Sequence, residues 1–233
     1  MAAIWSSMPP MAQEDLSAHL HGAAQPCYGE VHIRNRGRLP HWEKEQGLYF
    51  ISFHLADSLP QSVLAKIAER HRILATAKQD NVHLLPEQKA LLAGYSRARI
   101  EEYFDRGAGL CPFFDNRIAG AMAAALRFKE EKHYRLLAWC VMPNHVHVVA
   151  TLFPGQDLAK IVKAWKSFSA KSANFALARK GRFWQREYYD RLIRNGDELG
   201  RAVRYVIGNP AKAGLENWPW VWSAGWEAGA TNS

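Results

Sequence analysis

Short, nearly continuous apolar runs predict strands in some parts of the chain. Residues 48–55 are rich in aromatic and branched side chains and end at the turn-forming run 57–60, which predicts a strand near the centre of a sheet. Two further apolar runs, 134–141 and 145–149, are separated only by residues 142–144. A turn this short between two apolar runs predicts an antiparallel hairpin.

Other stretches show the period of a helix. Apolar residues at helical spacing predict amphipathic helices over 116–132 and 157–179. Two more helices are expected at 62–77 and 86–106, the second beginning with a proline. Together these two helices make 57–114 a helical insertion after the first strand.

The last third of the chain predicts a short strand and a final helix. An aromatic loop leads into a strand within 183–194, and a helix follows over 198–208. Because the residue before a proline avoids the helical region, this helix is expected to end before Pro210.

The order of these elements predicts the fold class. It reads strand, helix, strand, strand, helix, strand, which indicates an α+β protein with a ferredoxin-like βαββαβ antiparallel sheet, a helical insertion and an extra C-terminal helix. The first and third strands lie at the centre, and no helix is expected over the face that bears two histidines. We expect an irregular N-terminal arm at 1–46, a single domain at 47–215 and an aromatic, irregular tail at 216–233.

Two histidines enter the strand after the hairpin turn. Because side chains alternate along a strand, His145 and His147 point to one face, whereas Val146 and Val148 point into a core. Two imidazoles on one face supply half of a metal site. The alternative is a pair of partly buried histidines with no ligand.

The net charge of +8 and the pI near 9.5 favour a polyanionic partner, most commonly nucleic acid. Between residues 157 and 204, 12 Lys and Arg face 5 Asp and Glu, and aromatic residues are interleaved with them. Cations for phosphates and rings for bases suit single-stranded nucleic acid, although the same rings are also candidates for the core. The candidate DNA-binding residues are Lys160, Lys163, Lys166, Arg182, Trp184, Arg186, Arg191 and Arg194.

The cysteines and the apolar runs exclude several classes of protein. The 3 cysteines are widely spaced, so neither a zinc knuckle nor a disulfide framework is indicated. No apolar run approaches the roughly 20 residues of a membrane span, and no secretory signal is recognisable. We therefore expect a cytoplasmic protein with no membrane partner.

Tyr205 and Asn209 are four residues apart and share one face of the last helix. A tyrosine hydroxyl is a feasible covalent nucleophile, and an amide oxygen is a ligand for Mg²⁺ or Mn²⁺. Spacing alone favours a buried tyrosine beside a helix-ending Asn-Pro over a catalytic pair. Residues 134–156 contain no Asp or Glu, so a metal at the two histidines would depend on Asn209, water and substrate phosphate.

Four segments resemble the REP-associated tyrosine transposases, a group of single-strand transposases with a His-hydrophobe-His motif and one tyrosine. They are 47–60, 137–149, 184–194 and 205–214. The combination of the Met-Pro-Asn-His-Val-His hairpin with the downstream Tyr-x-x-x-Asn-Pro is specific, whereas neither half would be alone.

This resemblance implies a ferredoxin-like catalytic domain that binds hairpin-forming single-stranded DNA and needs a divalent metal, Mg²⁺ or Mn²⁺. By position, His145, His147 and Asn209 would be the metal ligands. Tyr205 on the extra helix would be the nucleophile, with Tyr188 as the alternative because it follows Trp184 and is flanked by arginines.

The implied activity is that of a metal-dependent single-stranded DNA endonuclease and strand transferase that forms a 5′-phosphotyrosine intermediate. Two alternatives stay open: a non-catalytic single-stranded nucleic-acid-binding protein derived from a transposase, and a metal-dependent phosphodiesterase that uses water. The resemblance further suggests association with the nucleoid and leaves a monomer and a homodimer both possible.

Overall fold

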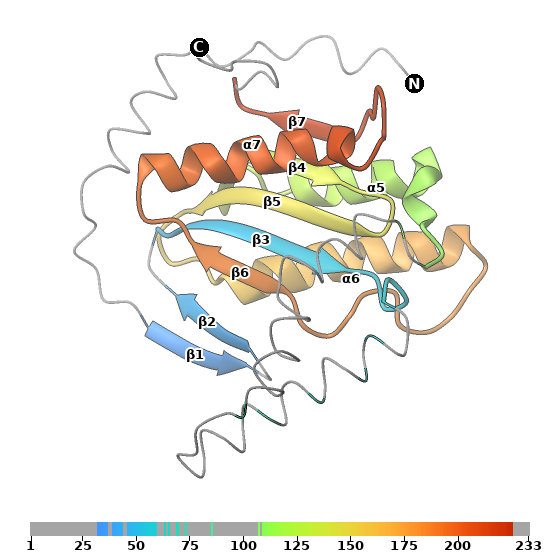
Figure 1. The fold of residues 1–233 in the computed structure, drawn as a ribbon, viewed down its shortest axis with the longest axis horizontal. Helices are drawn as coiled ribbons and strands as arrows, with labels where there is room; N and C mark the ends of the chain where they lie inside the picture. Colours follow the sequence, from blue (N-terminus) through green and yellow to red (C-terminus); the bar gives the residue numbers. More distant parts are fainter. Residues whose placement is uncertain are drawn as a thin grey trace.

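The computed structural model describes residues 46–59 and 109–225, the backbone of 32–36 and 39–43, and isolated positions within 60–108. Its centre is a five-stranded sheet in which every neighbouring pair is antiparallel, in the order β6-β3-β5-β4-β7 (Figure 1). The strands are β3 (Leu48–His54), β4 (Tyr134–Val141), β5 (His145–Leu152), β6 (Tyr189–Leu192) and β7 (Val221–Ser223).

The fold class predicted from the sequence is confirmed. The strands β3, β4, β5 and β6 follow one another in the βαββαβ order, and β3 and β5 are the central neighbours. The protein is therefore an α+β protein with a ferredoxin-like antiparallel sheet.

Two helices cover one face of this sheet. The helix α5 (Asn116–Arg127) is capped by Asp115, and α6 (Leu158–Ala176) is capped by Asp157. Both end a few residues earlier than predicted. They bury a core into which β3 and β5 alternately point their apolar side chains, and the short 3₁₀ helix η1 (Pro112–Phe114) adds Phe113 to it. None of the helices in the described part of the chain has the length and hydropathy to cross a membrane.

The helix α7 (Gly196–Lys212) covers the opposite face, so the expectation of an open histidine face is wrong. Leu199, Val203 and Val206 form an apolar stripe that packs in a second core cluster with Phe50 and Val149. The stripe is visible in the sequence, but the order of elements alone does not say which face it covers.

The predicted end of this helix is also wrong, because α7 continues through Pro210. A proline removes one backbone donor and disturbs the helix most in its interior. Here it stands in the last turn, where the amide of Ala213 donates to the carbonyls of Asn209 and Pro210, each at 3.1 Å.

Both ends of the described chain are more regular than predicted. In the segment expected to be an irregular arm, β1 (His32–Arg36) pairs antiparallel with β2 (Leu39–Glu43). In the tail, β7 extends the sheet along β4, with Trp222 opposite Trp139. Three residues are too few to show a strand period in the sequence.

The short strand predicted within 183–194 is β6, in which Tyr189–Leu192 pairs with β3. The helices predicted for the insertion 57–114 lie largely outside the described residues. The predicted domain boundaries stay predictions.

Candidate active site between the sheet and α7

The two histidines of β5 lie next to each other on the face that α7 covers. Their ring centroids are 4.6 Å apart, and both side chains are almost fully buried. Val146 and Val148 point to the other face, into the core beneath α5 and α6. The alternation of the strand therefore places both imidazoles between the sheet and α7.

The protonation of His145 is set by its neighbour. Its Nδ1 lies 2.7 Å from the Oδ1 of Asn144, an acceptor, so Nδ1 carries the proton and Nε2 keeps its lone pair. Burial lowers the pKa of His145 to about 3, and the side chain of Asn209 partly opposes this shift. The imidazole is therefore neutral at physiological pH, which is the form that binds metals.

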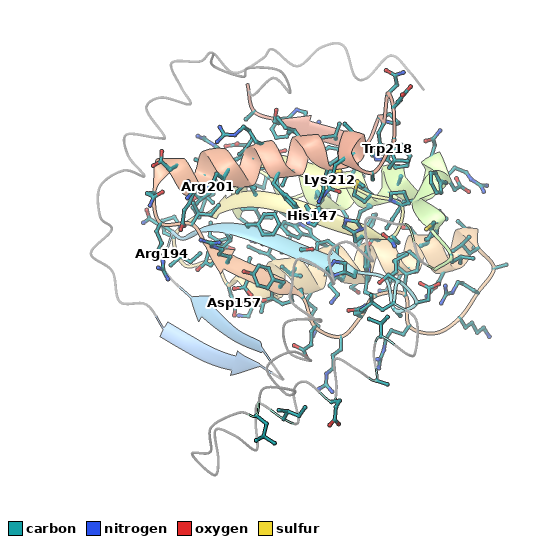
Figure 2. The ribbon with its side chains drawn as sticks, viewed as in Figure 1. His147, Asp157, Arg194, Arg201, Lys212 and Trp218 are labelled. Carbon is teal, nitrogen blue, oxygen red and sulfur yellow. The ribbon has the colours of Figure 1, made fainter. Side chains whose placement is uncertain are left out.

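The helix α7 brings Tyr205 and Asn209 to the same place. The Tyr205 ring is half-buried, and its centroid lies 5.2 Å from that of His147 and 5.7 Å from that of Phe50 (Figure 2 labels His147 beside α7). The buried Asn209 side chain opposes the fall in the pKa of His145. Neither amide atom of Asn209 forms a full hydrogen bond with another described residue. The four residues predicted for the site thus lie together within one chain: His145, His147, Tyr205 and Asn209.

A third histidine joins this face. His54, at the end of β3, is paired with His145 in the sheet register, and their rings stack at 5.4 Å. The Oγ of Ser52 lies 3.4 Å from its Nε2. Sequence analysis gave His54 no role, because only the register of β3 against β5 shows that the two imidazoles meet.

The side chains in this region can hold a metal only with help from the substrate. Among the described residues no group of three or more His, Cys, Asp or Glu could hold a metal ion. The available donors are the imidazoles of His145 and His147 and the amide oxygen of Asn209, which still has hydrogen-bonding capacity. This nitrogen and oxygen donor set fits Mn²⁺ or Mg²⁺ if phosphate oxygens or water complete the shell.

The alternative tyrosine lies elsewhere. Tyr188 packs against the core beneath α5 and α6, on the face away from the two histidines. Its neighbour Tyr189 is the one that turns toward the histidine face, where its ring lies 6.3 Å from Phe50. The structure therefore brings Tyr205, and not Tyr188, to the imidazoles.

The predicted DNA-binding residues are spread over several surfaces. Lys160 and Lys163 are exposed on α6, across the sheet from the histidines. Lys166 is half-buried and donates to the carbonyls of residues 185, 186 and 187, at 2.8, 3.1 and 3.4 Å. Burial lowers its pKa to about 8. Trp184 lies in the core with its indole nitrogen donating to Ser169, which does not fit a role in base stacking.

The four arginines among these candidates are exposed. Arg182 and Arg186 lie in the loop before β6, whereas Arg194 lies just before α7, and Arg191 on β6 forms an ion pair of 2.8 Å with Glu198. The predicted DNA-binding residues do not include the cations of α7 itself. Three of these are exposed: Arg201, Arg204 and Lys212. Charge density along the sequence could not distinguish the side of the sheet on which each cation lies.

Comparison with known proteins places this geometry in a class. Residues 113–208 match the family model described as "Transposase IS200 like", a segment that contains both histidines and Tyr205 and ends one residue before Asn209. Over this segment the chain is similar to the IS200-like transposases.

Two curated relatives narrow the class. The REP-associated tyrosine transposase of Escherichia coli (strain K12) is 29% identical over 100 residues, which cover 41% of this chain and 58% of that protein. A relative from Haemophilus influenzae is 26% identical over 105 residues, which cover 39% of this chain and 60% of that protein. The predicted resemblance to the REP-associated tyrosine transposases is confirmed, although the chain spans only about three fifths of the length of these relatives.

A solved structure of a REP-associated tyrosine transposase bound to a REP hairpin aligns with 86% of this chain and 93% of its own. The identity is 16% and the TM-score is 0.44.

Proposed function

We propose that this protein is a metal-dependent enzyme that nicks and joins single-stranded DNA containing hairpins, through a 5′-phosphotyrosine intermediate. The observation that supports the proposal best is the contact of the Tyr205 ring with His147, whose ring centroids are 5.2 Å apart. Asn209, on the same helix as Tyr205, interacts with His145. A phenol beside two buried imidazoles combines a nucleophile with a binding site for a phosphate-bound cation.

His145, His147 and Asn209 would hold the divalent metal in this proposal. When bound, such a metal supplies a positive charge that polarises a non-bridging oxygen of the scissile phosphate. The protein's own residues prepare the site. Asn144 keeps the proton of His145 on Nδ1, and burial keeps that imidazole neutral, so its Nε2 lone pair is available without the loss of a proton.

The chemical step attributed to Tyr205 is an in-line displacement at phosphorus. Its hydroxyl loses a proton to solvent, the oxygen forms a bond to phosphorus, and the bond from phosphorus to the 3′ oxygen breaks. The departing oxygen takes a proton and becomes a free 3′-OH. The phosphodiester is conserved as a phosphotyrosine ester, so the 3′-OH of another strand can reverse the step and join DNA.

The test uses hairpin-containing single-stranded DNA labelled on the 3′ side of the nick, incubated with Mg²⁺ or Mn²⁺. The proposal predicts that the label moves with the protein on a denaturing gel, and that EDTA or Tyr205→Phe removes this adduct. Tyr188→Phe is the matched control and retains it. Cleavage without an adduct would instead support a phosphodiesterase, and tight binding that is indifferent to EDTA and to His145→Ala, with no cleavage, would support the binding-protein alternative.

A further inference from the structure

The outer side of α7 presents cations in line with Tyr205. Arg201, Tyr205, Gly208 and Lys212 stand at positions i, i+4, i+7 and i+11, which lie on one side of an α-helix. Arg201 and Lys212 are exposed, at opposite ends of this row (Figure 2). Arg204, also exposed, stands four residues before Gly208 and widens the row. A polyanion lying along this side would pass the phenol.

Lys212, at the C-terminal end of this row, lies over the phenol ring of Tyr205. Its Nζ lies 5.9 Å from the centroid of the Tyr205 ring. A lysine near the C-terminus of a helix is also favoured by the helix dipole, so its charge alone does not require a substrate. Its position over the ring puts the ammonium beside the phenol that we propose as the nucleophile.

Gly208 provides an independent observation. Glycine in the interior of a helix is less stable than alanine, so its presence needs a reason. Its backbone does not have a positive φ, and a Cβ added to it would meet nothing within 4 Å. By contrast, a Cβ on Gly120 of α5 would lie 3.2 Å from the ring of Trp220, so packing explains that glycine. No described residue of the chain explains Gly208.

We propose that Gly208 and Lys212 form a binding site for the phosphodiester backbone beside Tyr205. The missing side chain of Gly208 lets the backbone of a single strand approach α7, and the Lys212 ammonium pairs with a non-bridging phosphate oxygen. The inference rests on the proposed function, because Tyr205 must be the residue that attacks. It adds a subsite that binds phosphates of the substrate and does not distinguish between bases.

The test compares single-turnover adduct formation, DNA affinity and thermal unfolding for Gly208→Ala and Lys212→Met. The glycine control is Gly196→Ala, at the far end of the same helix, where an added Cβ also meets nothing within 4 Å. The lysine controls are Lys132→Met, which removes an exposed charge from the turn between α5 and β4, and Lys212→Arg, which keeps the charge in place.

Gly208→Ala is expected to unfold at the same or a higher temperature, yet to form the adduct at least tenfold more slowly. Lys212→Met is expected to slow adduct formation about tenfold, and to lower the slope of log affinity against log salt by about 0.7, as one lost contact to a single strand predicts. Gly196→Ala and Lys132→Met should behave as wild type, and Lys212→Arg should retain most of the rate.

Wild-type adduct rates in both Gly208→Ala and Lys212→Met would overturn the inference and leave the proposed function intact. A wild-type protein that forms no adduct would overturn the proposed function instead. In that case the binding data decide: a reduced salt slope in Lys212→Met alone would support the phosphate site, and an unchanged slope would refute it.

Discussion

At the scale of single residues, the hydrogen bond between Asn144 and His145 decides which imidazole nitrogen is available to a ligand. Asn144→Ala removes the acceptor for Nδ1, so the ring can change tautomer or rotate. Loss of such an outer partner is expected to weaken metal binding by roughly 10- to 100-fold. Titration with Mn²⁺, followed by electron paramagnetic resonance, measures this.

Asn144→Asp is the matched control, because it keeps an oxygen acceptor in place and should bind Mn²⁺ at least as well as wild type. Equal Mn²⁺ affinity in Asn144→Ala and wild type would show that this hydrogen bond has no role in the site.

His145 also makes stability depend on pH in the metal-free protein. Its pKa is about 3 when folded and 6.5 in its unperturbed state, so between these values the unfolded chain binds a proton that the folded chain does not. Stability from this residue therefore rises with pH across that window. At pH 5 the loss relative to neutral pH is about 2 kcal/mol, from about 1.4 kcal/mol per pH unit.

Urea unfolding in EDTA at pH 7.5 and pH 5.0 measures this loss. His145→Gln lacks the titrating group, so its stability should fall by about 2 kcal/mol less than that of wild type over the same interval. An equal fall in both proteins would mean that His145 is not buried as a neutral imidazole.

At the scale of elements, one buried group joins α5, β4 and α6. The Tyr134 hydroxyl on β4 donates to the carbonyl of Leu126 at 2.7 Å and accepts from the indole nitrogen of Trp165 at 2.8 Å. Tyr134→Phe leaves both partners unsatisfied in the core, which is expected to lower the free energy of unfolding by about 2 kcal/mol.

Tyr134 lies on the face of the sheet away from the candidate active site. Adduct formation per folded molecule should therefore be unchanged in Tyr134→Phe, as chemical denaturation combined with a single-turnover assay would show. A large loss of rate in fully folded variant protein would indicate that the two faces of the sheet are coupled.

The elements that the sequence predicted well have a strong local signal. The apolar run 134–141 matches β4, and the two-histidine run after the turn marked the beginning of β5, which continues three residues further than predicted. Asp157 marked the beginning of α6. The covering role of α7 was missed, because a helix pattern shows an apolar stripe but not its partner.

The residues of the candidate site likewise fall into those that the sequence predicted and those that it did not. Spacing along one element predicted that His145 and His147 share a face, and that Tyr205 and Asn209 share another. The contact of His54 with His145 depends on the register between two strands, and the burial of Trp184 depends on tertiary packing. Periodicity within a single segment contains neither piece of information.

At the scale of the whole molecule, the two sides of the sheet are expected to differ in their use of DNA. The proposed catalytic residues lie under α7, so the arginines of α7 should contact the strand. The double variant Arg201→Met/Arg204→Met is expected to weaken binding of single-stranded DNA about tenfold or more at moderate salt.

Lys160→Met/Lys163→Met is the matched control, because it removes the same charge from α6 on the opposite side. Its affinity, measured by fluorescence anisotropy in parallel, should stay within about twofold of wild type. The reverse order of the two effects would place the DNA on the α6 side, as the sequence prediction for Lys160 and Lys163 implies.

The most direct measurement of the central claim is the identity of the tyrosine that becomes bound to DNA. Trypsin cleaves after Arg204 and after Lys212, so Tyr205 lies in its own peptide, whereas Tyr188 lies in the peptide 187–191. Mass spectrometry of the digested adduct is predicted to find the nucleotide mass on the peptide 205–212. A nucleotide on the peptide 187–191, which carries Tyr188 and Tyr189, would contradict the account, because the attacking phenol would then not be Tyr205.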